Sequence, residues 1–101
     1  MAANEPTADS PPGAAAPHHE VRSLAKVLGA ARALILRVVA DAPGLTTSEL
    51  AGRTALSLAS VSEHATTLRE AGLMSSQRDG QRHRHFPTSA AIALLDASNN
   101  N

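Results

Sequence analysis

Residues 46–72 read TTSELAGRTALSLASVSEHATTLREAG, and this stretch decides the fold. Thr46 and Glu49 have capping-box spacing, in which each side chain bonds the other's backbone N–H, so they predict a short helix that continues to about Thr54. Ser57 is a good N-cap for a second helix, because its hydroxyl can accept from a free N–H of the first turn. Two short helices joined by a tight turn form a helix-turn-helix.

The second helix of this stretch has an apolar stripe along one side. Leu58, Val61, Ala65 and Leu68 recur at three- and four-residue steps, and Gly72 is predicted as the C-cap. We expect the stripe to face the core. Short polar side chains then project from the opposite surface, where they can reach phosphates or the base edges of a DNA major groove.

Helical spacing also precedes this stretch. Apolar residues recur at three- and four-residue steps from Leu24 to Val39. The pattern fits one long helix, or two helices joined at Gly29. The sequence Asp-Ala-Pro-Gly at 41–44 ends it, since Pro and Gly interrupt helices.

A β-hairpin is predicted after the second helix. Residues 73–78 and 81–86 flank the pair Asp79-Gly80. A pair of this composition favours a type I′ turn, in which both central residues have positive φ.

One more helix completes the pattern, opening at 87–89 (Pro-Thr-Ser) and ending near Ala97. The predicted fold class is mainly α with a small β-hairpin, in the order α-α-α-α-β-β-α of a winged helix-turn-helix. We expect this domain to span 21–97, between a flexible, Pro/Ala-rich acidic tail at 1–20 and a frayed C-terminal tail at 98–101.

The apolar content of the chain is low and unevenly distributed. Of its 101 residues 43% are hydrophobic, but 21 of these are Ala, and Val, Ile, Leu and Phe together number 20. None of the 20 lies in residues 1–20. The rest of the chain can therefore form one small core, and a core this small often needs a partner surface to be stable.

The zero net charge hides an asymmetry. Residues 1–20 contain three acidic and no basic residues, which leaves nine basic and six acidic residues, a net +3, in 21–101. The domain is thus mildly basic, as a nucleic-acid partner requires, and no more than that.

No metal, cofactor, membrane or catalytic site is expected. The chain has no cysteine, which excludes disulfides and thiolate ligands, and no apolar stretch approaches the length of a membrane span. His83 and His85 share one face of a strand, but no third ligand lies nearby in the sequence. No nucleophile-base pair or phosphate-binding loop indicates an enzyme, and His64 is interpreted as a partly packed helix residue.

Five segments within residues 24–96 carry a family resemblance: Leu28 to Leu36, Glu49 to Ala51, Ser60 to His64, Leu68 to Leu73, and Arg78 to Gly80. They resemble the ArsR (arsenical-resistance-repressor) family of bacterial transcription regulators, and MarR-type and other winged regulators share much of the pattern. The resemblance implies a winged helix-turn-helix fold and a DNA-binding function.

The sequence departs from that family pattern at several positions. Ala55 stands where a turn glycine is common, Thr54 where an apolar residue is usual, and Ala65 where a leucine usually packs. His83 and His85 stand where the return strand usually carries apolar or aromatic residues. These departures predict a loosely seated second helix and leave the hairpin register open.

The expected DNA-binding residues lie at the start of the first helix of the helix-turn-helix, on the second helix and at its N-cap, and on the hairpin. An arginine near a wing tip can contact phosphate or enter a narrow minor groove, and Glu63 can accept from a cytosine amino group. The predicted set is Thr47, Ser57, Ala59, Ser60, Ser62, Glu63, Thr66, Thr67, Arg78, Arg82 and Arg84.

A homodimer is expected through the first and last helices, which is also where the resembling family dimerises. These helices carry more apolar surface than a small monomer core can cover, although packing within the chain is the alternative. The predicted interface residues are Val21, Leu24, Val27, Leu28, Ile92, Leu94 and Leu95.

The favoured function is a dimeric, sequence-specific repressor that binds double-stranded DNA in the cytoplasm, at the nucleoid. The alternative is a protein-protein interaction adaptor without specific DNA binding, which the modest +3 charge favours. The metal sensors of the resembling family cannot be mapped here, because cysteine is absent and residues 89–97 offer only Asp96. Any small-molecule effector is left open.

Overall fold

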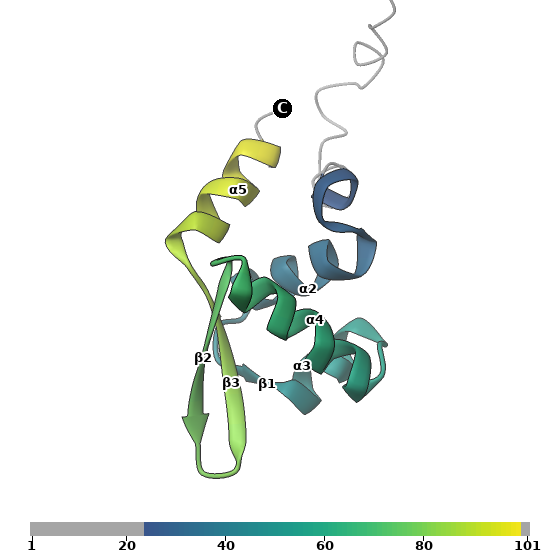
Figure 1. Cartoon of the computed structure of the whole chain (residues 1–101), viewed down its shortest axis with the longest axis vertical. Coiled ribbons are helices and arrows are strands. Elements are labelled where there is room, and N and C mark those ends of the chain that lie inside the picture. Colours follow the sequence, from purple (N-terminus) through teal and green to yellow (C-terminus); the bar gives the residue numbers. More distant parts are fainter. Residues whose placement is uncertain (1–23, 100–101) are drawn as a thin grey trace, which may run out of the picture.

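The computed structural model describes residues 24–99, so the predicted N-terminal tail and Val21 lie outside the described residues. A helical segment at 24–28 comes first. It is followed by α2 (Ala30–Asp41), β1 (Leu45–Thr46), α3 (Thr47–Thr54), α4 (Leu58–Glu70), β2 (Met74–Asp79), β3 (Arg82–Pro87) and α5 (Ser89–Asn99). Helix α5 and the segment 24–28 lie at one end of the domain, and the β2–β3 hairpin projects at the other (Figure 1). This is the predicted winged helix-turn-helix.

Gly29 divides the first helical region in two, so the second of the two predicted alternatives is correct. Its φ is +92°, a backbone conformation that glycine adopts without a steric cost. Its N–H still donates to Ala25 O at 2.9 Å, and its carbonyl accepts from Ala33 N at 3.0 Å. The two helices are therefore joined without losing these hydrogen bonds.

The predicted helix starts in the helix-turn-helix are confirmed. Thr46 Oγ1 accepts from Glu49 N at 3.2 Å, and Glu49 Oε1 accepts from Thr46 N at 2.9 Å, which completes the capping box. Ser57 Oγ accepts from Ser60 N at 3.0 Å and caps α4. Local side chains thus set where both helices begin.

Helix α4 ends one residue before the predicted position, with Ala71 as the C-cap. Gly72 follows it with φ +78°. The N–H of Gly72 donates to Arg69 O at 3.0 Å, and that of Leu73 donates to Leu68 O at 2.9 Å, the two hydrogen bonds of a Schellman motif. This motif turns the chain directly into β2.

The core consists of two apolar clusters. The first joins α2, α3, α4, β1 and β2 and includes Val61, Ala65 and Leu68 of the predicted stripe. The second joins segment 24–28, α2 and α5. The prediction that Leu58 faces the core is wrong: 54% of this residue is exposed. It begins α4 beyond the edge of the core, and Leu56, just before the helix, packs against the first cluster instead.

The sequence did not predict β1, which makes the hairpin part of a three-stranded sheet in the order β1-β3-β2. Both pairs of strands are antiparallel, with Leu45 opposite His85 and Thr46 opposite Arg84. A two-residue strand has no periodicity of its own. Its existence depends on a partner about 40 residues away, which a local pattern cannot show.

The hairpin turn lies one residue further along than predicted. Asp79 pairs with Arg82, so the two-residue loop is Gly80-Gln81 and the predicted central pair was wrong. Gly80 has φ +67°, while Gln81 is not among the described residues with positive φ. A positive φ at the first central position alone is typical of a type II′ turn, which favours glycine there.

Helix α5 begins after Thr88 and continues to Asn99, beyond the predicted end near Ala97. Thr88 Oγ1 accepts from Ala91 N at 3.2 Å and donates to Gly72 O at 2.8 Å. Ser98, which lies past the predicted end, is buried. No helix within residues 24–99 is long and apolar enough to cross a membrane.

Ala55, between α3 and α4, has φ +61° and ψ +23°, a left-handed conformation that costs a non-glycine residue about 1–2 kcal/mol. We therefore expect Ala55→Gly to raise the free energy of unfolding by about 0.5–1 kcal/mol, after allowing for the greater freedom of glycine in the unfolded chain. Urea denaturation measures this change. Ala93→Gly, in the exposed interior of α5, should instead cost about 1 kcal/mol. Destabilisation by both substitutions would contradict the assignment of strain to Ala55.

Candidate nucleic-acid interface

The exposed side of α4 is polar and slightly hollow, as predicted. Six residues line the hollow, and all six belong to the predicted DNA-binding set: Ser57, Ala59, Ser60, Ser62, Glu63 and Thr66. Thr67 is less available than they are. It is half-buried, and its hydroxyl donates to the carbonyl of Glu63 at 3.3 Å.

A second open cavity, of about 500 Å³, lies between the start of α3, the start of α4 and the hairpin tip. Three of the predicted residues, Thr47, Ser62 and Arg82, meet there. The sequence interpretation did not select the other lining residues, which come together only through the tertiary fold. They are Thr46, Ser48, Glu49, Leu58, Gln81 and His83.

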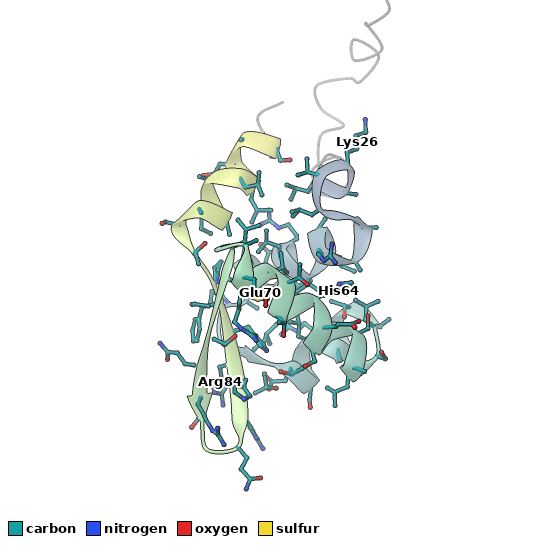
Figure 2. All side chains as sticks on the ribbon, viewed as in Figure 1. Lys26, His64, Glu70 and Arg84 are labelled. Carbon is teal, nitrogen blue, oxygen red and sulfur yellow. The ribbon has the colours of Figure 1, made fainter. Side chains whose placement is uncertain are left out.

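The three predicted hairpin arginines differ in what they contact. Arg82 is exposed, and within residues 24–99 its side chain forms no hydrogen bond or ion pair. Arg78 is exposed and donates from Nε to Gly80 O at 3.0 Å. Arg84, on the hairpin in Figure 2, is half-buried and bonds Asp79 Oδ2 at 2.9 Å and Gly44 O at 3.0 Å. Arg84 therefore stabilises the chain itself, and Arg78 and Arg82 are the arginines that present charge to solvent.

His85 is buried where the hairpin meets the helices, with 2% of the residue exposed. Its Nε2 lies 2.8 Å from Oγ1 of Thr47 in α3, and its Nδ1 lies 2.8 Å from Oγ of Ser76 in β2. Arg69 of α4 donates from Nη1 to the same Ser76 oxygen at 3.4 Å and from Nη2 to Thr66 Oγ1 at 3.2 Å. One chain of hydrogen bonds thus links α3, both hairpin strands and α4.

This network suits a neutral His85 ring. One ring nitrogen of a neutral imidazole donates and the other accepts, and the hydroxyls of Thr47 and Ser76 can take either role, so both ring nitrogens have a partner. Burial lowers the pKa of His85, and the positive charge of Arg69, followed by that of His83, lowers it further. The neutral imidazole is the form that suits this site.

Glu49 places a negative charge at the edge of the cavity. The hydrogen bond from the Thr46 backbone N–H lowers the pKa of Glu49, and the charges of Arg84 and Arg82 also lower it. The carboxylate therefore stays ionised near neutral pH. Its charge partly offsets that of Arg82 at the same cavity.

The predicted dimer residues fall into two groups. Leu24 and Leu95 are buried within the chain and Leu28 and Leu94 pack against them, as the alternative of packing within the chain requires. Val27 and Ile92 remain exposed, by 74% and 41%. Within residues 24–99 no group of three or more His, Asp or Glu side chains could hold a metal ion.

Comparison with known proteins gives a consistent result. Residues 32–73 match the family model described as winged helix-turn-helix DNA-binding. The HTH-type transcriptional regulator YgaV of Escherichia coli strain K12 is 36% identical over 67 residues, which cover 66% of this chain and 68% of that protein.

Solved structures share the fold over most of the chain. A predicted DNA-binding transcriptional regulator from E. coli is 30% identical with a TM-score of 0.63, covering 82% of this chain and 90% of that one. MepR, a transcription regulator of the Staphylococcus aureus multidrug efflux pump MepA, is 20% identical with a TM-score of 0.71, and the chain spans 64% of its length. The second likeness shows the fold alone. The 36%-identical regulator and the matching family model show that this chain belongs to the family of winged helix-turn-helix DNA-binding transcriptional regulators.

Proposed function

We propose that the protein is an ArsR-like, homodimeric, sequence-specific repressor, which binds double-stranded DNA with α4 in the major groove and uses the β2–β3 hairpin as a wing. One observation carries this proposal. The polar face of α4 and the exposed Arg82 of the hairpin border the same cavity, on the same side of the domain. A repressor of this kind would act in the cytoplasm, by covering a promoter.

The side chains on α4 suit base recognition. Ser60 and Ser62 are short hydroxyl side chains that can donate to or accept from base edges or phosphates, and Glu63 can accept from the amino group of cytosine. Because Ser60 and Ser62 are short, this part of the helix can approach the base edges of a groove about 12 Å wide.

The hairpin supplies the net positive charge that α4 lacks, since Arg69 in α4 is outweighed by Glu63 and Glu70. Arg78 and Arg82 flank the turn, and their guanidinium groups can contact phosphates or enter a narrow minor groove. Such contacts add affinity that does not depend on sequence, while contacts from α4 supply the preference.

The exposed apolar residues at the far end of the domain favour a dimer. Val27 and Ile92 lie on segment 24–28 and α5, the end opposite the hairpin tip (Figure 1). A two-fold axis there would leave both α4 helices and both wings free. It could place the two recognition helices roughly 34 Å apart, about one turn of DNA.

The proposal is tested by titrating the purified protein against DNA flanking its own coding region at two salt concentrations. We expect binding that weakens with salt and prefers particular sequences, and a protein–DNA complex whose mass corresponds to two chains per DNA site. Binding to no DNA, or binding without salt dependence and preference, would contradict it. A stoichiometric protein partner recovered in a pull-down, with no DNA shift, would then favour the adaptor function.

A further inference from the structure

Leu58 is an exposed leucine in an otherwise polar cavity. It begins α4, and 54% of it is exposed. Every other residue lining the cavity between α3, α4 and the hairpin tip is polar or charged. The other exposed large hydrophobic residues of the described chain, Val27 and Ile92, lie in segment 24–28 and α5, at the end proposed for dimerisation.

Folding does not explain the side chain at this position. Leu58 belongs to neither apolar cluster, and Leu56 packs against the first cluster at this end of α4. Ser57 supplies the N-cap hydrogen bond through its own side chain, so the cap does not depend on Leu58 either. An exposed leucine on its own needs no explanation. One at the proposed DNA interface, among polar neighbours, indicates an apolar feature on the ligand.

The position of Leu58 aims it at base edges. Ser62 lies one helical turn further along α4 and lines both the cavity and the polar hollow, so Leu58 and Ser62 share one side of the helix. Residues in the first turns of a recognition helix are the ones that contact base edges in the major groove.

The chemistry of the groove then restricts the ligand. Base edges in the major groove present hydrogen-bond donors and acceptors, with one apolar group, the C5-methyl of thymine. We propose that Leu58 is a specificity-determining residue that packs on a thymine methyl group in each half-site. This inference rests on the proposed function and adds to it the identity of one recognised base.

The test replaces single thymines by deoxyuridine in a DNA site selected with the wild-type protein. This change removes the methyl group and keeps base pairing. At one position per half-site we expect wild-type binding to weaken by about fourfold, the effect of one buried methyl-sized group. Leu58→Ala should bind thymine DNA more weakly by a similar factor and should not respond to deoxyuridine at that position.

Two further variants control the experiment. Ser60→Ala removes a polar contact on the same helix and should keep the full deoxyuridine effect. Leu58→Gln keeps side-chain length and helix propensity but removes the apolar contact, so it should lose the effect as Leu58→Ala does. The exposure of Leu58 predicts that both Leu58 variants melt within a few degrees of the wild type.

The outcomes separate this inference from the proposed function. Two outcomes would overturn the role of Leu58 and leave the proposed function intact. In both, the wild type binds its DNA site specifically. Either Leu58→Ala then responds to deoxyuridine as strongly as the wild type does, or the wild type responds to deoxyuridine at no thymine. Absence of salt-dependent, sequence-preferring binding by the wild type would overturn both.

Discussion

Reversing the charge of both exposed wing arginines, Arg78→Glu with Arg82→Glu, is expected to weaken DNA binding roughly 100-fold or more at moderate salt, on every sequence alike. Each arginine that contacts phosphate releases counterions on binding, and a glutamate at the same place repels the phosphate instead. Arg82→Glu alone should weaken DNA binding roughly tenfold. This single variant leaves the hydrogen bond from Arg78 to the Gly80 carbonyl in place.

The salt dependence of binding gives a second readout. The slope of log affinity against log salt should fall by about one for each arginine that contacts phosphate. Both chains of the dimer carry both changes, so the slope should fall by about four in the double variant and by about two in Arg82→Glu. Lys26→Glu is the matched control for Arg82→Glu. Lys26 is exposed on segment 24–28, far from the hairpin (Figure 2), and its reversal should leave the slope unchanged, provided that the dimer mass is also unchanged.

Substitutions on α4 should behave differently from those on the wing. Ser60→Ala and Glu63→Ala should change which bases are preferred, by about 1–3 kcal/mol at the contacted position, while the salt slope stays the same. If wing and helix variants instead gave the same pattern of losses on all sequences, the division into phosphate contacts and base contacts would be wrong.

The parts of the fold that local chemistry determines could be predicted from the sequence. Thr46, Glu49 and Ser57 bond backbone groups within three residues, so the starts of α3 and α4 can be recognised from their spacing. The exposed polar face of α4 follows from helical periodicity in the same way.

The parts that depend on contacts distant in the sequence could not be predicted. Strand β1 exists because it pairs with β3, and the hairpin register differs by two partners from the one that an Asp79-Gly80 turn implies. That turn would place His83 opposite Ser76, whereas the observed turn places His85 there. A shift of the turn by one residue therefore decides which histidine, His83 or His85, lies opposite Ser76.

Periodicity also shows which residues share a face but not what covers that face. Leu24 and Leu95 have the spacing of an interface, and the structure buries them against each other's helices inside one chain. Leu58 has the spacing of the α4 core stripe, yet it lies past the end of the core. In both cases the sequence pattern is correct, and the tertiary position of the residue decides its role.

Removing the buried imidazole is the second large expected effect, because no other group can replace both of its hydrogen bonds. His85→Ala should lower the free energy of unfolding by about 2–4 kcal/mol, through the cavity and the unpaired hydroxyls of Thr47 and Ser76. Urea denaturation near pH 7.5 measures it. His83→Ala, at an exposed position of the same strand, should change stability little.

The same site predicts how stability depends on pH. Because the fold lowers the pKa of His85 below its ordinary value of 6.5, the unfolded chain binds more protons than the folded chain in this range. The contribution of His85 is therefore fully present above about pH 6.5 and is lost as pH falls through its lowered pKa. Protonation would make both ring nitrogens donors and would place a positive imidazolium beside Ser76 Oγ, which already accepts from the Arg69 cation.

Denaturation at pH 7.5 and pH 5 distinguishes this role from simple packing. The wild type and His83→Ala should both lose stability at the lower pH, and His85→Leu, which fills the space without titrating, should lose less. Because the network also joins α3 and α4 to both hairpin strands, wild-type DNA affinity should fall over the same pH range more steeply than that of His85→Leu. Parallel pH curves for the wild type and His85→Leu would show that His85 does not titrate within this network.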